Sequence, residues 1–249
     1  MKTKQPAHLT CGLFASGCCF GGKFTTGFLG HPVEDTRKGI EVCRVHSCVK
    51  RFLLLLTIAL PFTSQADDIL VHPGKVITQP ELRQPLGPEW SVAKGKWTPA
   101  DGVLTAVEIP DEKHVSVLHL KTGPVNLVVD CEFRLNGGKI FYVGCDGTSH
   151  VGRLVITEKV AKLAEDSMEG PGKSGSHVLA ETKIDLKQGE WQKLHVEYAG
   201  DQMAARLNGQ EMKVQHEYLA TPKVRWWFAA GGDNVQIRNI RFSEGDPVK

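Results

Sequence analysis

The stretch GEWQKLHVEYAGDQMAARLNGQE, residues 189–211, constrains the fold more than any other part of the chain. Between residues 191 and 198 apolar and polar side chains alternate, which is the period of a strand with one buried face. Gly200-Asp201 has the composition of a tight turn, and the alternation resumes after it. Asn208-Gly209 predicts a two-residue hairpin, because both residues tolerate the positive φ of a type I′ turn. This stretch therefore predicts antiparallel sheet.

Similar strand patterns follow one another through residues 88–243, separated by Gly, Pro, Asn and Asp. In VNLVVDCEFRL the apolar residues share one face of the predicted strand, and Asp130, Glu132 and Arg134 share the other. No stretch has the 3.6-residue period of a useful helix. Many short strands with regular turns predict an all-β fold, and we expect a two-sheet antiparallel jelly-roll sandwich over residues 88–249.

Residues 49–66, VKRFLLLLTIALPFTSQA, are typical of a secretory signal peptide. Lys50-Arg51 is the positive start, residues 52–62 form an apolar run, and Ser64-Gln65-Ala66 fits a small-residue cleavage site. The run of eleven apolar residues is shorter than the roughly twenty that a membrane span needs. We therefore expect a secreted or periplasmic protein with no membrane span in its mature chain, and a linker or edge segment at 67–87.

The leader at residues 1–48 precedes this signal and contains five of the seven cysteines, in no spacing typical of a zinc site. We interpret it as a disordered leader or as the product of a misassigned start, with true translation starting near Val49. Residues 67–249 then carry a net charge of −3, which argues against a nucleic-acid partner. Cys131 and Cys145 flank a predicted hairpin, and two alternatives stay open for them: a disulfide or two buried thiols.

Four segments resemble the 3-keto-disaccharide hydrolase domain family, also described as 3-keto-glucoside lyases and hydratases. They are EWSVAKGKWTPADGVLTA, NLVVDCEFRLNGGKIFY, GEWQKLHVEYAGDQMAARLNGQE and VQIRNIRF, and the resemblance covers about residues 88–243. It implies a concanavalin A-like sandwich and a secreted enzyme that acts on 3-keto glucosides. Many of the matching positions, such as Asn208-Gly209, are scaffold positions of sandwiches in general.

The chain also departs from the family pattern where chemistry is expected. After Gly137-Gly138 the family continues with Asn-Ser-Gly and an Arg, whereas this chain has Lys139 and an apolar run. The family's polar residue and His in the strand before its glycine fall at Trp227 and Ala229, and a methyl group cannot act as acid, base or ligand. A non-catalytic carbohydrate-binding or surface-adhesion sandwich is therefore the alternative function.

Six residues are candidates for a functional site on one face of the sandwich. Under the enzyme hypothesis Glu132 is the base that removes a proton next to a ketone, and Arg134 stabilises the enolate. The candidates for substrate binding are Asp130, His150, Arg153 and Trp227. Trp227 lies on the opposite side of its strand from Trp226, where its indole could stack on a sugar or pack under a loop. For the three charged residues of 130–134 the alternative is a solvated face with cross-strand ion pairs.

The expected partner is a glycan or oligosaccharide. The cofactor is open, with a divalent cation such as Ca²⁺ as one alternative. Glu165, Asp166 and Glu169 in the polar, glycine-rich segment 165–177 have the oxygen ligands that Ca²⁺ prefers, although such acidic segments are usually only solvated. No nucleophile elbow, zinc-protease motif or phosphate-binding glycine loop is found in the sequence.

Overall fold

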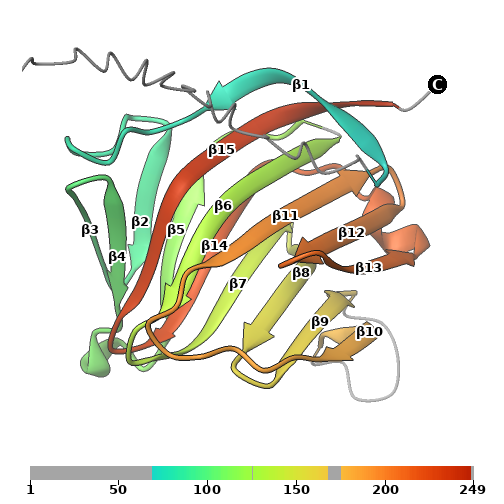
Figure 1. Ribbon diagram of the computed structural model, residues 1–249. Helices are drawn as coiled ribbons and strands as arrows, with labels where there is room; N and C mark the ends of the chain where they lie inside the picture. The colour runs from blue at the N-terminus through green and yellow to red at the C-terminus, as the bar shows by residue number, and fades with distance from the viewer. Residues whose placement is uncertain (1–68, 125, 168–174, 248–249) are drawn as a thin grey trace, which may run out of the picture. The chain divides into compact units, whose positions relative to one another are not determined.

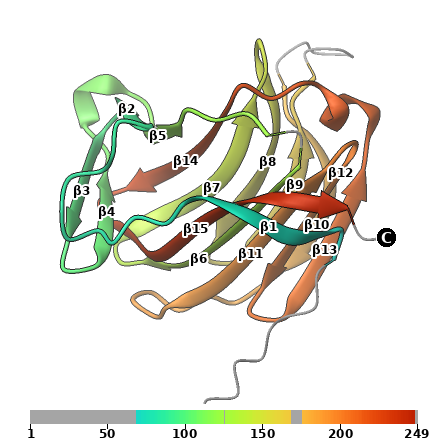
Figure 2. The ribbon, with the colours of Figure 1, turned by 90° about the horizontal axis from the view of Figure 1, so that it is seen from above.

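The strands of this protein form two layers that face each other across one apolar core (Figures 1 and 2). The computed structural model describes residues 69–124, 126–167 and 175–247, all within one unit, residues 62–249. The signal-like segment 49–66 and the leader with its five cysteines lie outside the described residues.

The described residues form fifteen strands and two short 3-10 segments, without an α-helix, which confirms the all-β prediction. One sheet has eight strands in the order β13-β12-β11-β6-β15-β4-β3, with β1 added against β15, and the other has seven in the order β10-β9-β8-β7-β14-β5-β2. All strand pairs are antiparallel. The elements are β1 (Val71–Thr78), β2 (Trp90–Lys94), β3 (Lys96–Ala100), β4 (Val103–Val107), η1 (Pro110–Glu112), β5 (Ser116–Leu120), β6 (Leu127–Leu135), β7 (Gly138–Asp146), β8 (His150–Thr157), β9 (Val160–Glu165), β10 (His177–Lys183), β11 (Gln192–Ala199), β12 (Gln202–Leu207), β13 (Gln210–Gln215), η2 (Glu217–Ala220), β14 (Arg225–Gly232) and β15 (Val235–Pro247).

The core fills the space between the sheets, mainly with every second side chain of the strands. On β14 Trp226 and Phe228 point into it, and the ring of Trp226 meets Tyr198 of β11 edge to face at 4.6 Å. Phe133 of β6 stacks on Phe141 of β7 at 4.9 Å. Such aromatic pairs contribute about 0.5–1.5 kcal/mol beyond the area they bury, so they help to hold the two sheets together.

The turns follow the predicted chemistry. Asn208 and Gly209 have φ values of 51° and 88°, the positive pair of a type I′ turn, and they join β12 to β13. Asp101 and Gly102 have φ values of 51° and 80° and join β3 to β4 in the same way. The hairpin predicted at Asn208-Gly209 is confirmed.

The hairpin predicted between β6 and β7 is wrong. β6 pairs with β11 and β15 in the eight-stranded sheet, whereas β7 pairs with β8 and β14 in the other, so the turn after Leu135 crosses from one sheet to the other. Cys131 and Cys145 are consequently contributed by opposite sheets, and both are free and buried. Burial raises the pKa of the Cys145 thiol to about 12 and raises that of Cys131 further. Of the two alternatives, the structure has the two buried thiols.

The segment expected as a linker or edge contains β1, which pairs with β15, and its start is held by a buried carboxylate. Glu197 of β11, which is fully buried, accepts hydrogen bonds from the backbone N–H groups of Ile69, Leu70 and Val71. His195 bridges Glu197, at 2.6 Å, and Asp130, at 2.7 Å. Burial lowers the pKa of His195, but these two carboxylates outweigh it and raise the pKa to about 9.

Candidate functional site

A pocket of about 130 Å³ opens on the outer face of the seven-stranded sheet, the face turned away from the core. Its wall combines one indole, one phenol, one guanidinium and three imidazoles with small apolar side chains. The lining residues are His114, Val115, Val117, His119, Tyr142, His150, Arg153, Trp227 and Ala229.

The pairing register explains why these residues meet. Trp227 of β14 pairs with His119 of β5 on one side and with Gly144 of β7 on the other, and Gly144 pairs with Arg153 of β8. Four strands thus place one row of outward positions side by side, at about 4.8 Å per strand. Next to it a second row contains Val117, Ala229 and Tyr142. These two rows of sheet residues form the floor of the pocket.

Gly144 provides the space in which the Trp227 ring lies. A Cβ at position 144 would overlap the six-membered ring of the indole, so the ring lies directly against the backbone of β7. Trp227 is therefore only 5% exposed, although it faces outward as predicted. The edge of the ring meets His150 at 5.7 Å between centroids.

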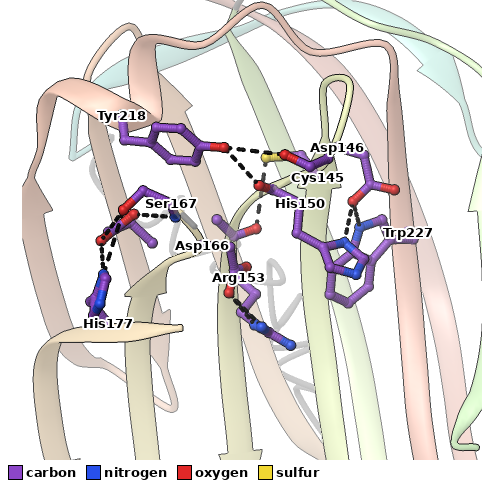
Figure 3. Close-up of polar contacts among 12 residues, drawn as sticks. Cys145, Asp146, His150, Arg153, Asp166, Ser167, His177, Tyr218 and Trp227 are labelled. Carbon is purple, nitrogen blue, oxygen red and sulfur yellow. Dashed lines mark hydrogen bonds and ion pairs between the residues drawn. The ribbon is translucent and has the colours of Figure 1, made fainter. Parts of the chain in front are cut away.

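Asp146, at the end of β7, fixes the orientation of three neighbours (Figure 3 shows two of them). Its carboxylate, only 1% exposed, accepts hydrogen bonds from Trp227 Nε1 at 2.7 Å, Arg225 Nε at 2.6 Å and, when that nitrogen carries its proton, His150 Nδ1 at 2.6 Å. Burial favours the protonated acid, but these donors outweigh it and hold the pKa of Asp146 below its usual value. The carboxylate is thus a fixed negative charge behind the pocket wall.

The two histidines on opposite sides of Trp227 are shifted in opposite directions. The hydrogen bond to Asp146 raises the pKa of His150 above 6.5, whereas burial, helped by the charge of Arg225, lowers the pKa of His119 below 6.5. The pocket therefore places an imidazole whose neutral form is favoured by its surroundings beside one whose charged form is favoured. Burial also raises the pKa of Tyr142, so its phenol stays protonated.

Arg153 is held against the pocket wall by a second buried carboxylate. Its Nε and Nη2 both donate to Oδ1 of Asp166, the former at 3.1 Å, and Asp166 is nearly inaccessible to solvent (Figure 3). Among the described residues Nη1 of Arg153 has no hydrogen-bond partner, and Oδ2 of Asp166 is buried without one. The guanidinium is therefore anchored at one end and free to bind a ligand at the other.

Glu165, Ser167 and His177 lie together beside β9, but they do not form a catalytic triad. Ser167 Oγ and Glu165 Oε1 both approach the same nitrogen, Nδ1 of His177, whereas a triad uses opposite ring nitrogens (Figure 3). Ser167 also donates to both oxygens of Glu165. Of the three acidic residues for which Ca²⁺ binding was one alternative, Glu165 and Asp166 thus have protein partners, and Glu169 lies outside the described residues. In the described part of the chain no three His, Cys, Asp or Glu side chains form a metal-binding group.

The structure divides the six predicted site residues between two faces. His150, Arg153 and Trp227 line the pocket of the seven-stranded sheet. Asp130, Glu132 and Arg134 lie on β6, on the outer face of the eight-stranded sheet. The prediction of one shared face is wrong, because β6 belongs to one layer and β8 and β14 to the other.

The β6 residues have partners on their own sheet. Glu132 pairs with Arg238 and accepts a hydrogen bond from Asn239, while Arg134 donates to Gln236 and to the carbonyl of Gly189. Asp130 is the partner of His195. The alternative that the sequence left open, cross-strand ion pairs, is thus present at Glu132 and Asp130, and Arg134 has uncharged oxygen partners.

The site residues predicted from sequence did not include His119, Tyr142, Asp146 and Arg225. His119 and Tyr142 alternate with buried neighbours, which places them on an outer face. Their meeting depends on β5 lying next to β14 and β14 next to β7, strands far apart in the chain. One signal in the sequence could have pointed to Asp146 as a site residue, namely the Asp146-Gly147 turn that comes shortly before His150.

Comparison with known proteins extends to the fold and no further. No protein-family model matches the chain, and no curated protein is similar to it. The carbohydrate binding module CBM66 from Bacillus subtilis is similar in structure with a TM-score of 0.51 and 11% identity, covering 62% of this chain and 95% of the module.

Two further solved structures reach the same TM-score of 0.51. The apo Crh5 transglycosylase is 8% identical in sequence, and the match covers 72% of this chain and 90% of the transglycosylase chain. A protein of unknown function with a galectin-like fold from Bacillus subtilis is 9% identical, with 72% and 100% covered. These similarities define the chain as a jelly-roll β-sandwich. Among the described residues no helix has the length and hydrophobicity of a membrane span.

Proposed function

We propose that the protein is secreted and binds one sugar residue of a glycan in the pocket of the seven-stranded sheet. The observation that carries this proposal is the composition of the pocket wall, in which the Trp227 indole lies among His119, Tyr142, His150 and Arg153. An aromatic surface with a few convergent polar groups is the usual composition of a small-molecule site. The signal-like segment 49–66 supports export.

The size of the pocket limits the ligand. A volume of about 130 Å³ is below the roughly 300–1,000 Å³ of pockets for drug-sized ligands. It fits a single sugar ring or the substituent of one, and the rest of a glycan would extend across the open face. The similarity in fold to a carbohydrate binding module and a transglycosylase agrees with a glycan as the partner.

A second candidate function is acid–base chemistry on 3-keto glucosides, the activity that the family resemblance implies. The specific observation in its favour is the opposite pKa shift of His119 and His150. A neutral His119 could accept the proton next to the ketone, and the charged groups of His150 and Arg153 could stabilise the enolate oxygen. These residues replace Glu132 and Arg134, whose charged groups are paired on the opposite face.

Proton NMR of a methyl 3-keto-glucoside and of methyl glucoside with the purified protein tests both functions. Broadened ligand signals without new signals would indicate binding alone, and new signals from an unsaturated or hydrolysed sugar would indicate the enzyme. The His119→Phe variant should lose turnover and the matched Glu132→Gln variant should keep it. If neither sugar changes its spectrum, and an acidic sugar also fails, the proposed glycan site is contradicted.

A further inference from the structure

The pocket is rich in hydrogen-bond donors and positive charge, and its side-chain acceptors are limited to the Tyr142 hydroxyl and imidazole nitrogens. None of the nine lining side chains is Asp, Glu, Asn or Gln, while four are His or Arg. The carboxylates of this region, Asp146 and Asp166, lie behind the wall and are 1% and 4% exposed. Glu108 is not part of the lining, although its charge is close enough to act on Tyr142.

The ion pairs leave an excess of positive charge at the rim. Asp146 is shared by Arg225 and His150, and Asp166 is paired with Arg153. With His150 protonated, these ion pairs contain three cations and two carboxylates, and Glu108 is a further carboxylate outside the lining. The side chains of His150 and Arg225 are 59% and 45% exposed, so the positive groups lie toward solvent and the negative groups lie beneath them.

Free donor atoms point to the same conclusion. Asp146 occupies Nδ1 of His150, and Asp166 occupies Nε and Nη2 of Arg153. Among the described residues this leaves Nε2 of His150 and Nη1 of Arg153 without a hydrogen-bond partner. A protonated imidazole and a guanidinium have only donors to offer.

The hydroxyl groups of a neutral sugar each donate as well as accept, so a site for them normally presents carboxylates or amides. A carboxylate or sulfate group only accepts, and hydrogen bonds between charged partners are about twice as strong as neutral ones. We propose that the ligand of this pocket is an acidic sugar, one whose carboxylate or sulfate group binds between Arg153 and His150. This inference rests on the proposed glycan site and specifies the class of sugar that it binds.

An NMR titration of the full chain with three matched probes tests the inference. The probes are methyl β-glucuronide, methyl β-glucoside and methyl β-glucoside 6-sulfate, which share one ring and differ in a single substituent. We expect at least one acidic probe to bind about tenfold or more tightly than the neutral glucoside, and the difference to decrease with added salt. The probe that binds more tightly identifies the acidic group as carboxylate or sulfate.

Two variants test the role of Arg153. Arg153→Gln should reduce the preference for the acidic probe to about threefold or less, and Arg153→Lys should retain part of it because the charge stays. The matched control, Arg134→Gln on the opposite face, should keep the full preference. The preference should also decrease as pH rises through the raised pKa of His150 and its imidazole loses the proton.

The outcomes separate this inference from the function on which it rests. Equal binding of the neutral and acidic probes to the unmodified chain overturns the inference and leaves a glycan site in place. Binding of none of the three overturns both. A preference that persists in a folded Arg153→Gln protein overturns the assignment to this pocket, and near-ultraviolet circular dichroism establishes whether that variant is folded.

Discussion

The outer faces of the two sheets both carry charged residues next to a tryptophan. They differ in whether these charged groups are paired with protein partners or, among the described residues, leave donor atoms free beside a pocket. On the eight-stranded sheet the guanidinium groups of Arg134 and Arg238 lie over the Trp191 ring at 4.5 and 4.1 Å, and each also has an oxygen partner. On the seven-stranded sheet Trp227 forms the wall of a pocket. We call the outer face of the eight-stranded sheet the closed face, because its charged groups are paired with protein partners. We call the outer face of the seven-stranded sheet the open face, because it contains the pocket.

Charged side chains on a sheet face do not by themselves mark a binding site. Glu132 and Arg134 were predicted as the base and the enolate partner of the implied ketone chemistry, but the neighbouring strand β15 supplies Arg238 and Gln236 as their partners. Arg153 differs because its partner Asp166 binds it from one side only. Substitutions on the closed face should therefore change stability, and those on the open face should change binding.

The largest effect is expected at Glu197 on the closed face. Glu197→Gln removes a fully buried charge that is bonded to three backbone N–H groups and to His195, so the free energy of unfolding should decrease by about 3–5 kcal/mol. Urea denaturation measures this change. Glu211→Gln, an exposed ion-pair residue of the same sheet, is the control and should cost less than about 1 kcal/mol. Equal losses in the two variants would contradict the role of Glu197.

The next effect is a dependence of stability on pH that comes from the same face. A raised pKa means that the stabilisation by His195 is complete below pH 6.5 and is lost as pH rises through about 9. The shift from 6.5 to about 9 corresponds to about 3 kcal/mol. Urea denaturation at pH 6, 8 and 10 should show this loss, and Glu197→Gln should show less of it. A free energy of unfolding that stays constant between pH 6 and pH 10 in the unmodified protein would contradict this prediction.

Asp146 on the open face should affect binding as well as stability. Asp146→Asn removes the charge that holds Arg225, His150 and Trp227, and the unfolding free energy should decrease by about 2–3 kcal/mol. Sugar binding should also weaken by about tenfold or more, because the pocket wall loses its orientation. Asp130→Asn, the carboxylate of the other histidine pair, should leave binding unchanged. Titration of both variants with the acidic sugar probe decides the point.

The smallest effect is expected at Glu132, which sharpens the contrast with the sequence-based hypothesis. Glu132 is 22% exposed and pairs with Arg238, so Glu132→Gln should lower the free energy of unfolding by about 1 kcal/mol or less. Glycan binding and any turnover should be unchanged. A loss of turnover by a hundredfold or more with an intact fold would return the active site to the eight-stranded sheet.

The sequence predicted what is local and missed what depends on strand order. The alternation along β6 and β11, the Asn208-Gly209 turn and the opposite orientation of Trp226 and Trp227 follow from the pleat and from φ preferences, so they were found. Strand order depends on packing between distant segments. Two hairpin-like signals look alike in sequence, yet Asn208-Gly209 joins paired strands and the turn at Gly137 joins opposite sheets.

The same limit explains the divided site. His150 and Trp227 were correctly placed on an outer face, but a single sequence does not show which outward residues share a face. The alternation that puts His119 and Tyr142 outward is equally present at Asp130 and His195. Only the neighbours of each strand in the sheet distinguish the two groups, and the hydrogen-bonded register provides them.

The pairing of β1 with β15 has a consequence for how this domain could be combined with others. Val71 and Pro247 are direct partners across the two strands, so the chain enters and leaves the sandwich at one point (Figure 1). A domain whose ends are adjacent can be inserted into a surface loop of a host protein without separating the host's own strands. Joining the two ends by a short linker would likewise permit new termini at an exposed turn such as Asn208-Gly209. The pairing of the first and last strands thus makes the sandwich suited to insertion and to circular permutation.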